Sequence, residues 1–189
     1  MNINRREAII RMAVFLGGSF VGPRLFSAAL DETAPVTDFG FSVAEIALLD
    51  ELGDTIIPET DTPGAKAVYI GAFIAMMVHD CYDPAERANF KTGLTQLATD
   101  YRVRHGHDFA AGPATVRTEY LNEVDLAHKK DRHSRKPSLV AFRMVKDLTV
   151  LGYFTSEIGA TRVARHTEMP GFYNGDVPYK KSDKVWATG

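Results

Sequence analysis

Apolar residues recur at helical spacing through most of residues 42–166, and no alternating pattern longer than four residues predicts a strand. The first predicted helix begins at Ser42, because Glu45 follows three residues later in the order of a capping box. Its apolar positions continue at helical spacing until Pro58 ends the pattern: Ile46, Leu48, Leu49, Leu52, Ile56 and Ile57.

A loop of turn-forming residues, 57–65, separates this helix from the strongly apolar segment 67–78. That segment is apolar on all sides, so we expect it to form a buried central helix. Its length and the polar residues His79 and Asp80 that follow it argue against a membrane span.

Further helices are predicted downstream. Asp83 as N-cap and Pro84 in the first turn begin one that continues to about His105. Residues 115 to about 129 form the next, and another begins at Pro137 and runs to Leu151. The segment 152–157 interrupts the pattern before a short helix over residues 157 to about 166.

These elements predict an all-α protein, an irregular five- to six-helix bundle with long loops, preceded by an N-terminal signal segment. The predicted organisation is a signal segment at 1–29, a linker at 30–41, a helical domain at 42–168 and an extended C-terminal segment at 169–189.

The first 29 residues have the order of a secretory signal. Arg5 and Arg6 precede a short apolar run, residues 12–22, and the small residues 27–29 provide a cleavage site. Adjacent arginines before the apolar run are typical of the twin-arginine export route, which predicts a periplasmic protein. An uncleaved anchor and an amphipathic N-terminal helix are the alternatives.

Composition narrows the possible functions. The formal charge is −2, and residues 1–29 hold four arginines and one glutamate, so their removal leaves −5. This acidic balance gives no indication of nucleic-acid binding. Cys81 is the only cysteine, which excludes an internal disulfide and every metal pattern built on paired cysteines.

The sequence contains few residues in an arrangement that would suit catalysis, cofactor binding or metal binding. No two of the six histidines have the i, i+3 or i+4 spacing of a helical metal site, so we favour solvated histidines. The neighbour of Cys81 is Asp80 rather than a cation that would activate a thiolate. Neither a Gly-x-Ser-x-Gly elbow nor a glycine fingerprint between strand and helix occurs, so we predict no catalytic, cofactor-binding or metal residue.

Two irregular segments, 57–65 and 152–179, present rigid residues that are suited to contacts. Aromatic residues on loops serve either as core residues or as interface anchors, and both interpretations stay open for Tyr153, Phe154 and Phe172. The basic run 129–136 is either a solvated turn or a contact to an acidic partner surface. The candidate partner-binding residues are Pro58, Thr62, Pro63, Tyr153, Phe172, Tyr173 and Trp186.

The order of these features resembles the gluconate 2-dehydrogenase subunit 3 family. Besides the twin-arginine-like leader, three stretches carry the resemblance: Ile56-Ile57-Pro58 followed by Thr60-Asp61-Thr62-Pro63-Gly64-Ala65, Gly152-Tyr153-Phe154-Thr155-Ser156-Glu157, and Met169-Pro170-Gly171-Phe172-Tyr173. It covers essentially the whole chain after the leader.

The resemblance implies a non-catalytic accessory subunit of a periplasmic flavin-dependent sugar or sugar-acid dehydrogenase. The implied partner is a large flavoprotein of the glucose–methanol–choline type that holds the FAD, often with a cytochrome c subunit. The small subunit would support folding of the large one and carry it through the twin-arginine route, with membrane association only through the complex or an uncleaved signal. The alternatives are a stand-alone periplasmic structural or chaperone protein and a small helical metalloenzyme.

The loop sequence also has a structural interpretation. In this interpretation Asp61 and Thr62 cap the buried helix that follows, while Pro63 and Gly64 set its entry.

Overall fold

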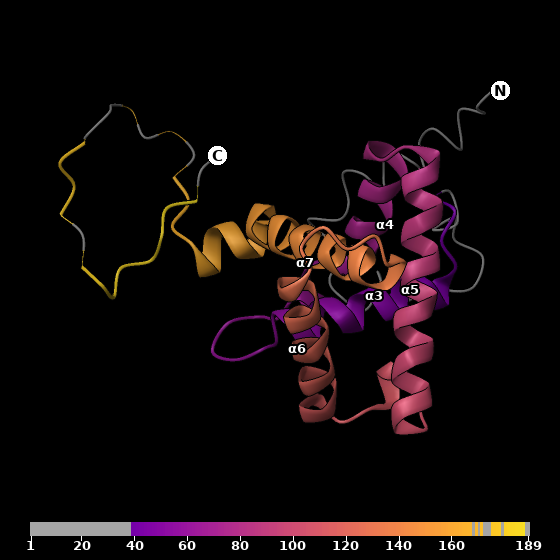
Figure 1. Ribbon diagram of the computed structural model, residues 1–189. Coiled ribbons are helices and arrows are strands. Elements are labelled where there is room, and N and C mark those ends of the chain that lie inside the picture. Colours follow the sequence, from indigo (N-terminus) through magenta and orange to yellow (C-terminus); the bar gives the residue numbers. More distant parts are fainter. Residues whose placement is uncertain (1–38, 168, 170, 172–174, 179, 188–189) are drawn as a thin grey trace, which may run out of the picture. The chain divides into compact units, whose positions relative to one another are not determined.

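The computed structural model describes residues 39–167, 169, 171, 175–178 and 180–187, and these residues are helical apart from turns, loops and one isolated β-bridge. The α-helices in chain order are α3 (Val43–Ile56), α4 (Ile70–Cys81), α5 (Pro84–His105), α6 (Ala114–Lys130) and α7 (Pro137–Thr155) (Figure 1). Two 3-10 turns, η2 (Ala65–Val68) and η3 (Phe109–Ala111), and a π-helical turn, η4 (Gly159–Val163), complete the described helices. The predicted all-α class is confirmed, whereas the predicted signal segment lies outside the described residues.

The helices α3, α5 and α7 begin where the sequence predicts, and the starts of α3 and α5 are reciprocal capping boxes. At α3, the Ser42 hydroxyl accepts from the Glu45 N–H at 3.2 Å, and the Glu45 carboxylate accepts from the Ser42 N–H at 2.7 Å. At α5, Asp83 accepts from two backbone donors at 2.8 Å, and Glu86 accepts from the Asp83 N–H at 3.1 Å. Each box satisfies backbone donors that a helix start leaves without a partner.

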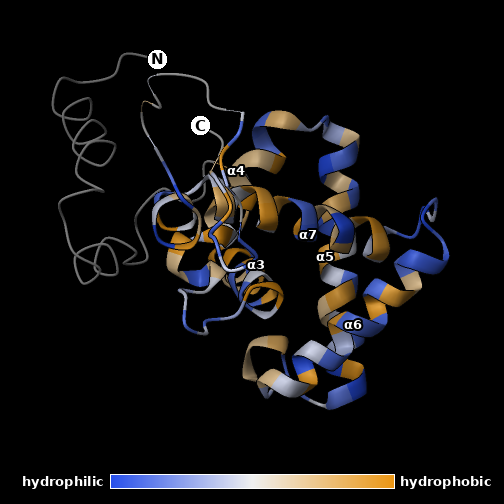
Figure 2. Ribbon diagram, turned by 90° about the vertical axis from the view of Figure 1, so that its left-hand side faces the viewer, coloured by the Kyte–Doolittle hydropathy of each residue, from blue (hydrophilic) through white to orange (hydrophobic). Residues whose placement is uncertain are grey.

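Helix α7 is the central element, since it contacts α3, α4, α5 and α6. Figure 2 shows the hydrophobic residues concentrated on α3, α4 and α7, while α5 and α6 carry many hydrophilic ones. The buried residues of α7 lie on one side of the helix: Ala141, Phe142, Met144, Val145, Leu148, Thr149, Gly152 and Tyr153. Helix α5 approaches this side most closely at Gly93, where no side chain separates the two backbones.

The predicted helix break at Gly152 is wrong, because α7 continues through it to Thr155. A Cβ on Gly152 would lie 2.5 Å from the Phe73 ring and 2.7 Å from the Ile70 side chain. The glycine therefore lets α4 pack against α7 and does not end the helix. The short helix predicted over residues 157 to about 166 begins at Glu157 as expected but ends earlier, with the π-helical turn at Val163.

The apolar segment 67–78 also differs from its prediction. Residues 65–68 form η2, and Tyr69 takes a left-handed conformation (φ 53°), so α4 begins only at Ile70. The helix buries one face, which includes Ile74 and Val78, whereas Phe73 is partly exposed. An all-apolar helix is therefore only half covered by the described residues.

The two ends of the described chain differ in what they contact. Phe41, from the end of the predicted linker, is buried and packs edge-on against Phe90 with ring centroids 6.0 Å apart. Near the C-terminus, the Arg165 N–H donates to the Val185 carbonyl at 2.8 Å, which forms a parallel bridge between Arg165 and Trp186. Among the described helices, none is both long enough and apolar enough to cross a membrane.

Candidate partner-binding site

The loop that carries the most specific part of the sequence pattern, residues 57–65, is fixed to the helical body. The Ala65 N–H donates to the Ile57 carbonyl at 2.9 Å and closes the loop at its base. The Tyr153 hydroxyl donates to the Pro63 carbonyl. The two irregular segments singled out in the sequence therefore contact each other, although 90 residues separate them.

Carboxylates of α3 organise the chain that follows this loop. Asp50 accepts from the Gly71 N–H at 2.7 Å and so satisfies a donor in the first turn of α4. Gly64 lies so close to α3 that a Cβ would meet the Asp54 carboxylate at 2.6 Å. The structural interpretation in which Asp61 and Thr62 cap α4 is wrong, because a neighbouring helix supplies the cap.

The charges of α3 differ in how they are compensated. Burial raises the pKa of Asp50, and the hydrogen bond from Gly71 opposes the effect only in part. Burial also acts to raise the pKa of Glu51, but hydrogen bonds from Lys66 and Arg117 outweigh it and leave the pKa lowered. Because Lys66 belongs to η2 and Arg117 to α6, Glu51 joins three elements through charged hydrogen bonds.

Four of the predicted partner-binding residues are accessible. Pro58 is exposed, and Thr62 and Pro63 are partly exposed. The side chain of Trp186 is 49 % exposed, and the Arg165 guanidinium lies over its ring, 4.2 Å from the centroid. These positions stay candidates for contact with a partner.

Of the other three predicted partner-binding residues, one is buried and two lie outside the described residues. Tyr153 is 1 % exposed and packs its ring at right angles to Phe154, with centroids 5.3 Å apart. A buried ring whose hydroxyl is already bonded offers no surface to a partner, so the core interpretation holds for Tyr153. Phe172 and Tyr173 lie outside the described residues.

The structure adds a surface that the sequence analysis missed, on the outer side of α7. Five exposed residues, at positions i, i+4, i+7, i+8 and i+11, lie on one helix face and are here named the α7 stripe: Arg143, Asp147, Val150, Leu151 and Phe154. The last three are 44 %, 45 % and 42 % exposed. The first four of these residues already share one face in the helix predicted to end at Leu151, whereas Phe154 joins them only because α7 continues past Gly152.

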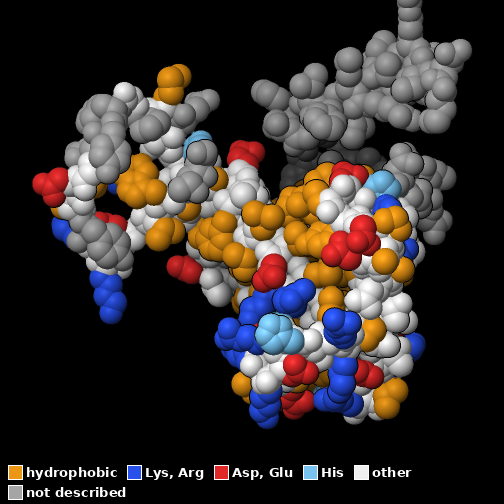
Figure 3. All heavy atoms as spheres, turned by 45° about the horizontal axis from the view of Figure 1, so that its top comes forward, with side chains coloured by type: hydrophobic (Ala, Val, Ile, Leu, Met, Phe, Trp, Pro, Cys, Tyr) orange, Lys and Arg blue, Asp and Glu red, His pale blue; other side chains and the backbone are white. Residues whose placement is uncertain are grey.

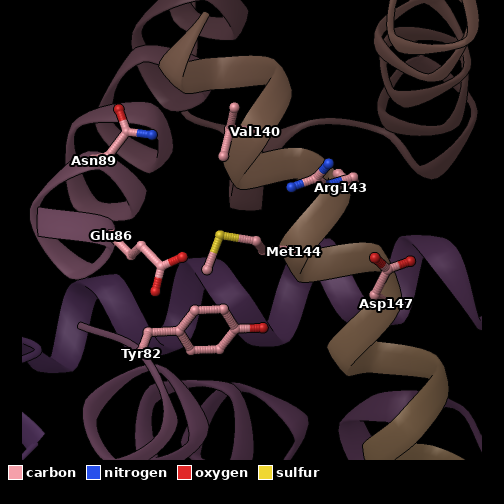
Figure 4. A pocket seen from close by; sticks show the side chains of 7 residues that line it. All are labelled: Tyr82, Glu86, Asn89, Val140, Arg143, Met144 and Asp147. Carbon is pink, nitrogen blue, oxygen red and sulfur yellow. The ribbon is translucent and has the colours of Figure 1, made fainter. Parts of the chain in front are cut away.

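Two hollows flank the charged half of the α7 stripe, and both are lined by Arg143 and Asp147. The first has a volume of about 260 Å³ and lies between α7 and the start of α5, with the Tyr82 ring and the Glu86 carboxylate facing it (Figure 4). Burial, followed by the charge of Asp147, raises the pKa of Tyr82. This hollow is thus bordered by charges of both signs.

The second hollow, named here the basic hollow, has a volume of about 340 Å³ between α6 and α7. Its lining consists of Asp125, His128, Lys129, Arg132, Arg143, Lys146 and Asp147. Asp125 accepts from Lys129 at 2.7 Å and from Lys146 at 2.6 Å, and these bonds lower its pKa. Figure 3 shows lysine and arginine side chains gathered around a histidine, beside a broad area of hydrophobic side chains.

Metal binding or catalysis would depend on how the described histidine, cysteine and carboxylate side chains are arranged. In the described part of the chain, no cluster of three or more His, Cys, Asp or Glu residues is placed to hold a metal ion. His105 and His107 instead pack beside the buried Tyr101, with ring centroids 4.6 Å and 5.5 Å away. Cys81 is a free, exposed thiol.

Comparison with known families identifies what the chain is similar to. Residues 43–171 match the family model described as gluconate 2-dehydrogenase subunit 3, which confirms the resemblance found in the sequence. The match runs from the first residue of α3 to beyond η4, and it includes the loop 57–65 and the segment 152–157. Searches of curated proteins and of solved structures gave no significant match.

Proposed function

The chain belongs to the gluconate 2-dehydrogenase subunit 3 family, and from this membership we propose that it is the non-catalytic accessory subunit of an exported, flavin-dependent sugar or sugar-acid dehydrogenase. In this proposal a large flavoprotein of the glucose–methanol–choline type holds the FAD and oxidises the substrate. A cytochrome c subunit of the same complex takes up the electrons. The family match over most of the chain is the observation that carries the proposal.

The shape of the surface supports a role in assembly. The two hollows, at about 260 and 340 Å³, fall at or below the lower end of the roughly 300–1,000 Å³ that ligand pockets occupy. The second hollow is lined almost entirely by charged side chains, and the first by a mixture of charged, polar and apolar ones, whereas ligand pockets are lined mainly by apolar groups. Beside them lie exposed apolar side chains of the kind found at protein interfaces.

The proposal gives the leader a task, because the large subunit would leave the cytoplasm only when bound to this chain. Replacing Arg5 and Arg6 with lysine keeps the positive charge but removes the arginine pair that the twin-arginine route requires. We expect the flavoprotein partner to stay in the cytoplasm, where it still forms the complex. Dye-linked dehydrogenase activity in the periplasm should fall to that of a strain lacking this chain.

The matched control is Arg11→Lys, which changes an arginine of the same segment outside the pair. This variant should export the flavoprotein as the wild type does. Export of the flavoprotein by the double lysine variant, or in the absence of this chain, would show that the leader does not have the proposed task.

The accessory role has its own test. The full chain purified alone should show neither flavin absorbance nor sugar oxidation, and co-expression with the flavoprotein should restore both in the complex. Stoichiometric iron or zinc in the lone chain, together with turnover, would favour the metalloenzyme alternative. A chain that forms no complex with the flavoprotein would favour the stand-alone structural alternative.

A further inference from the structure

We infer that the α7 stripe and the basic hollow together form the face on which the flavoprotein subunit docks, and that the flavoprotein meets this face with an apolar patch bordered by carboxylates. The inference rests on the proposed function and assigns it a surface. The sequence left a contact role open for Phe154 and for the basic run 129–136, and the structure adds Arg143, Asp147, Val150 and Leu151 on the same face.

The apolar half of the stripe is the first support. Val150, Leu151 and Phe154 are exposed on the side of α7 that faces away from its buried residues, although Phe154 also packs edge-on against the Tyr153 ring. Hydrophobic side chains that stand singly on a surface need no explanation, but three on one face of the central helix form a contiguous patch.

The charge beside this patch is the second support. The basic hollow contains four lysine and arginine side chains against two carboxylates, and Asp125 is already bonded to two lysines. Arg132 and Arg143 form no ion pair or hydrogen bond with any described residue. This local excess of positive charge stands on a chain whose net charge is −2, so it selects and steers an acidic surface.

The arrangement matches the anatomy of a specific interface, in which an apolar centre is surrounded by a polar rim. From Arg143 to Phe154 the stripe extends about 17 Å along the helix, at about 1.5 Å per residue. A standard interface buries about 800 Å² on each partner, so the stripe would form its centre and the two hollows its edge. Arginine and phenylalanine, both present here, are enriched in protein interfaces relative to the rest of the surface.

A second copy of the same chain is a poorer occupant. In a two-fold dimer the same patch appears on both copies, so each copy would bring the same excess of lysine and arginine to the interface. Neither copy would supply the carboxylates that Arg132 and Arg143 lack. A flavoprotein surface with an acidic border compensates both guanidinium groups.

The experiment compares the full chain and its variants for binding to the purified flavoprotein. The pair L151D/F154D places charge in the apolar half of the stripe, and the expected result is a Kd at least about 30-fold weaker, as for the loss of one interface hot spot of about 2 kcal/mol. The pair R132E/R143E reverses the charge of the basic hollow, and the association rate should fall and lose its dependence on salt. The matched control is V103D, at an apolar position of α5 that is 79 % exposed, and its Kd should stay within about twofold of the wild type.

A crosslinking measurement avoids dependence on the folding of the aspartate variants. In a C81S background, a photoreactive maleimide attached at L151C should crosslink to the flavoprotein, whereas the same group at V103C should not. Circular dichroism spectra that match the wild type establish that each variant is folded.

The outcomes separate the inference from the proposed function. Wild-type binding of the flavoprotein by L151D/F154D, together with crosslinking only at V103C, would overturn the docking face while leaving the accessory role intact. A dimer of the wild-type chain that L151D/F154D abolishes, with unchanged flavoprotein binding, would assign the stripe to self-association and overturn the inference as well. If the wild-type chain itself does not bind the flavoprotein, the proposed function fails.

Discussion

At Gly93, where α5 contacts α7, intrinsic helix propensity favours alanine, whereas tertiary packing requires glycine. In an isolated helix, alanine is about 1 kcal/mol more favourable than glycine, so Gly93→Ala would stabilise α5 by that measure. In the fold, the added Cβ would lie 2.0 Å from the Pro137 carbonyl oxygen and 2.6 Å from the Cβ of Ala141. Real Cβ contacts are essentially never shorter than 3.0 Å, so the two helices would have to move apart by about 1 Å.

The free-energy cost of Gly93→Ala depends on which atoms the added Cβ would meet. A flexible side chain can turn aside, but the Pro137 carbonyl belongs to the backbone at the start of α7. Overpacking of this kind costs about 1–3 kcal/mol and occasionally more, and a contact so short belongs in the upper part of that range. After the gain in helix propensity is subtracted, we expect Gly93→Ala to destabilise the protein by about 2 kcal/mol.

The assay is thermal unfolding followed by circular dichroism, supported by urea titration. For a chain of this size about 1 kcal/mol corresponds to roughly 2–4 °C, so Tm should fall by about 4–8 °C. Gln96→Ala is the control, because it changes an exposed position of the same helix and should shift stability by less than about 0.5 kcal/mol. A Gly93→Ala protein as stable as the wild type would refute the reasoning, since it would mean that local propensity decides at this position.

Two other predictions concern contacts between segments distant in sequence. Tyr153→Phe removes the hydroxyl that donates to the Pro63 carbonyl, and we expect a loss of about 0.5–1.5 kcal/mol in urea unfolding; an unchanged midpoint would contradict the role given to this bond. Glu51→Gln should cost about 1–3 kcal/mol at pH 7, because the carboxylate accepts charged hydrogen bonds from Lys66 and Arg117. Since the folded protein lowers the pKa of Glu51 below its ordinary 4.5, this stabilisation is present above that value and disappears as the pH falls through the lowered pKa. Unfolding at pH 7 and at stepwise lower pH measures the difference, and a difference that grows on acidification would contradict the assignment.

The sequence by itself determined the features that depend on neighbouring residues. The capping boxes at Ser42 and Asp83 join residues three positions apart, so their residue types alone predicted where α3 and α5 begin. The helical period of the apolar residues was sufficient for the all-α class, and the leader together with three short stretches, of which 56–65 is the most specific, was sufficient to indicate the family.

Only the tertiary structure decided what depends on residues far apart in the chain. Gly152 lies inside α7 and does not end it. A glycine stands there because a side chain would collide with the Phe73 ring of α4. Asp50 caps α4 across 21 residues, a pairing that the sequence around α4 does not indicate. Tyr153 became a core residue while Leu151, two positions earlier, remained on the surface. The physical reason is that burial is set by which helices pack against each face, and a helical period gives the faces but not their neighbours.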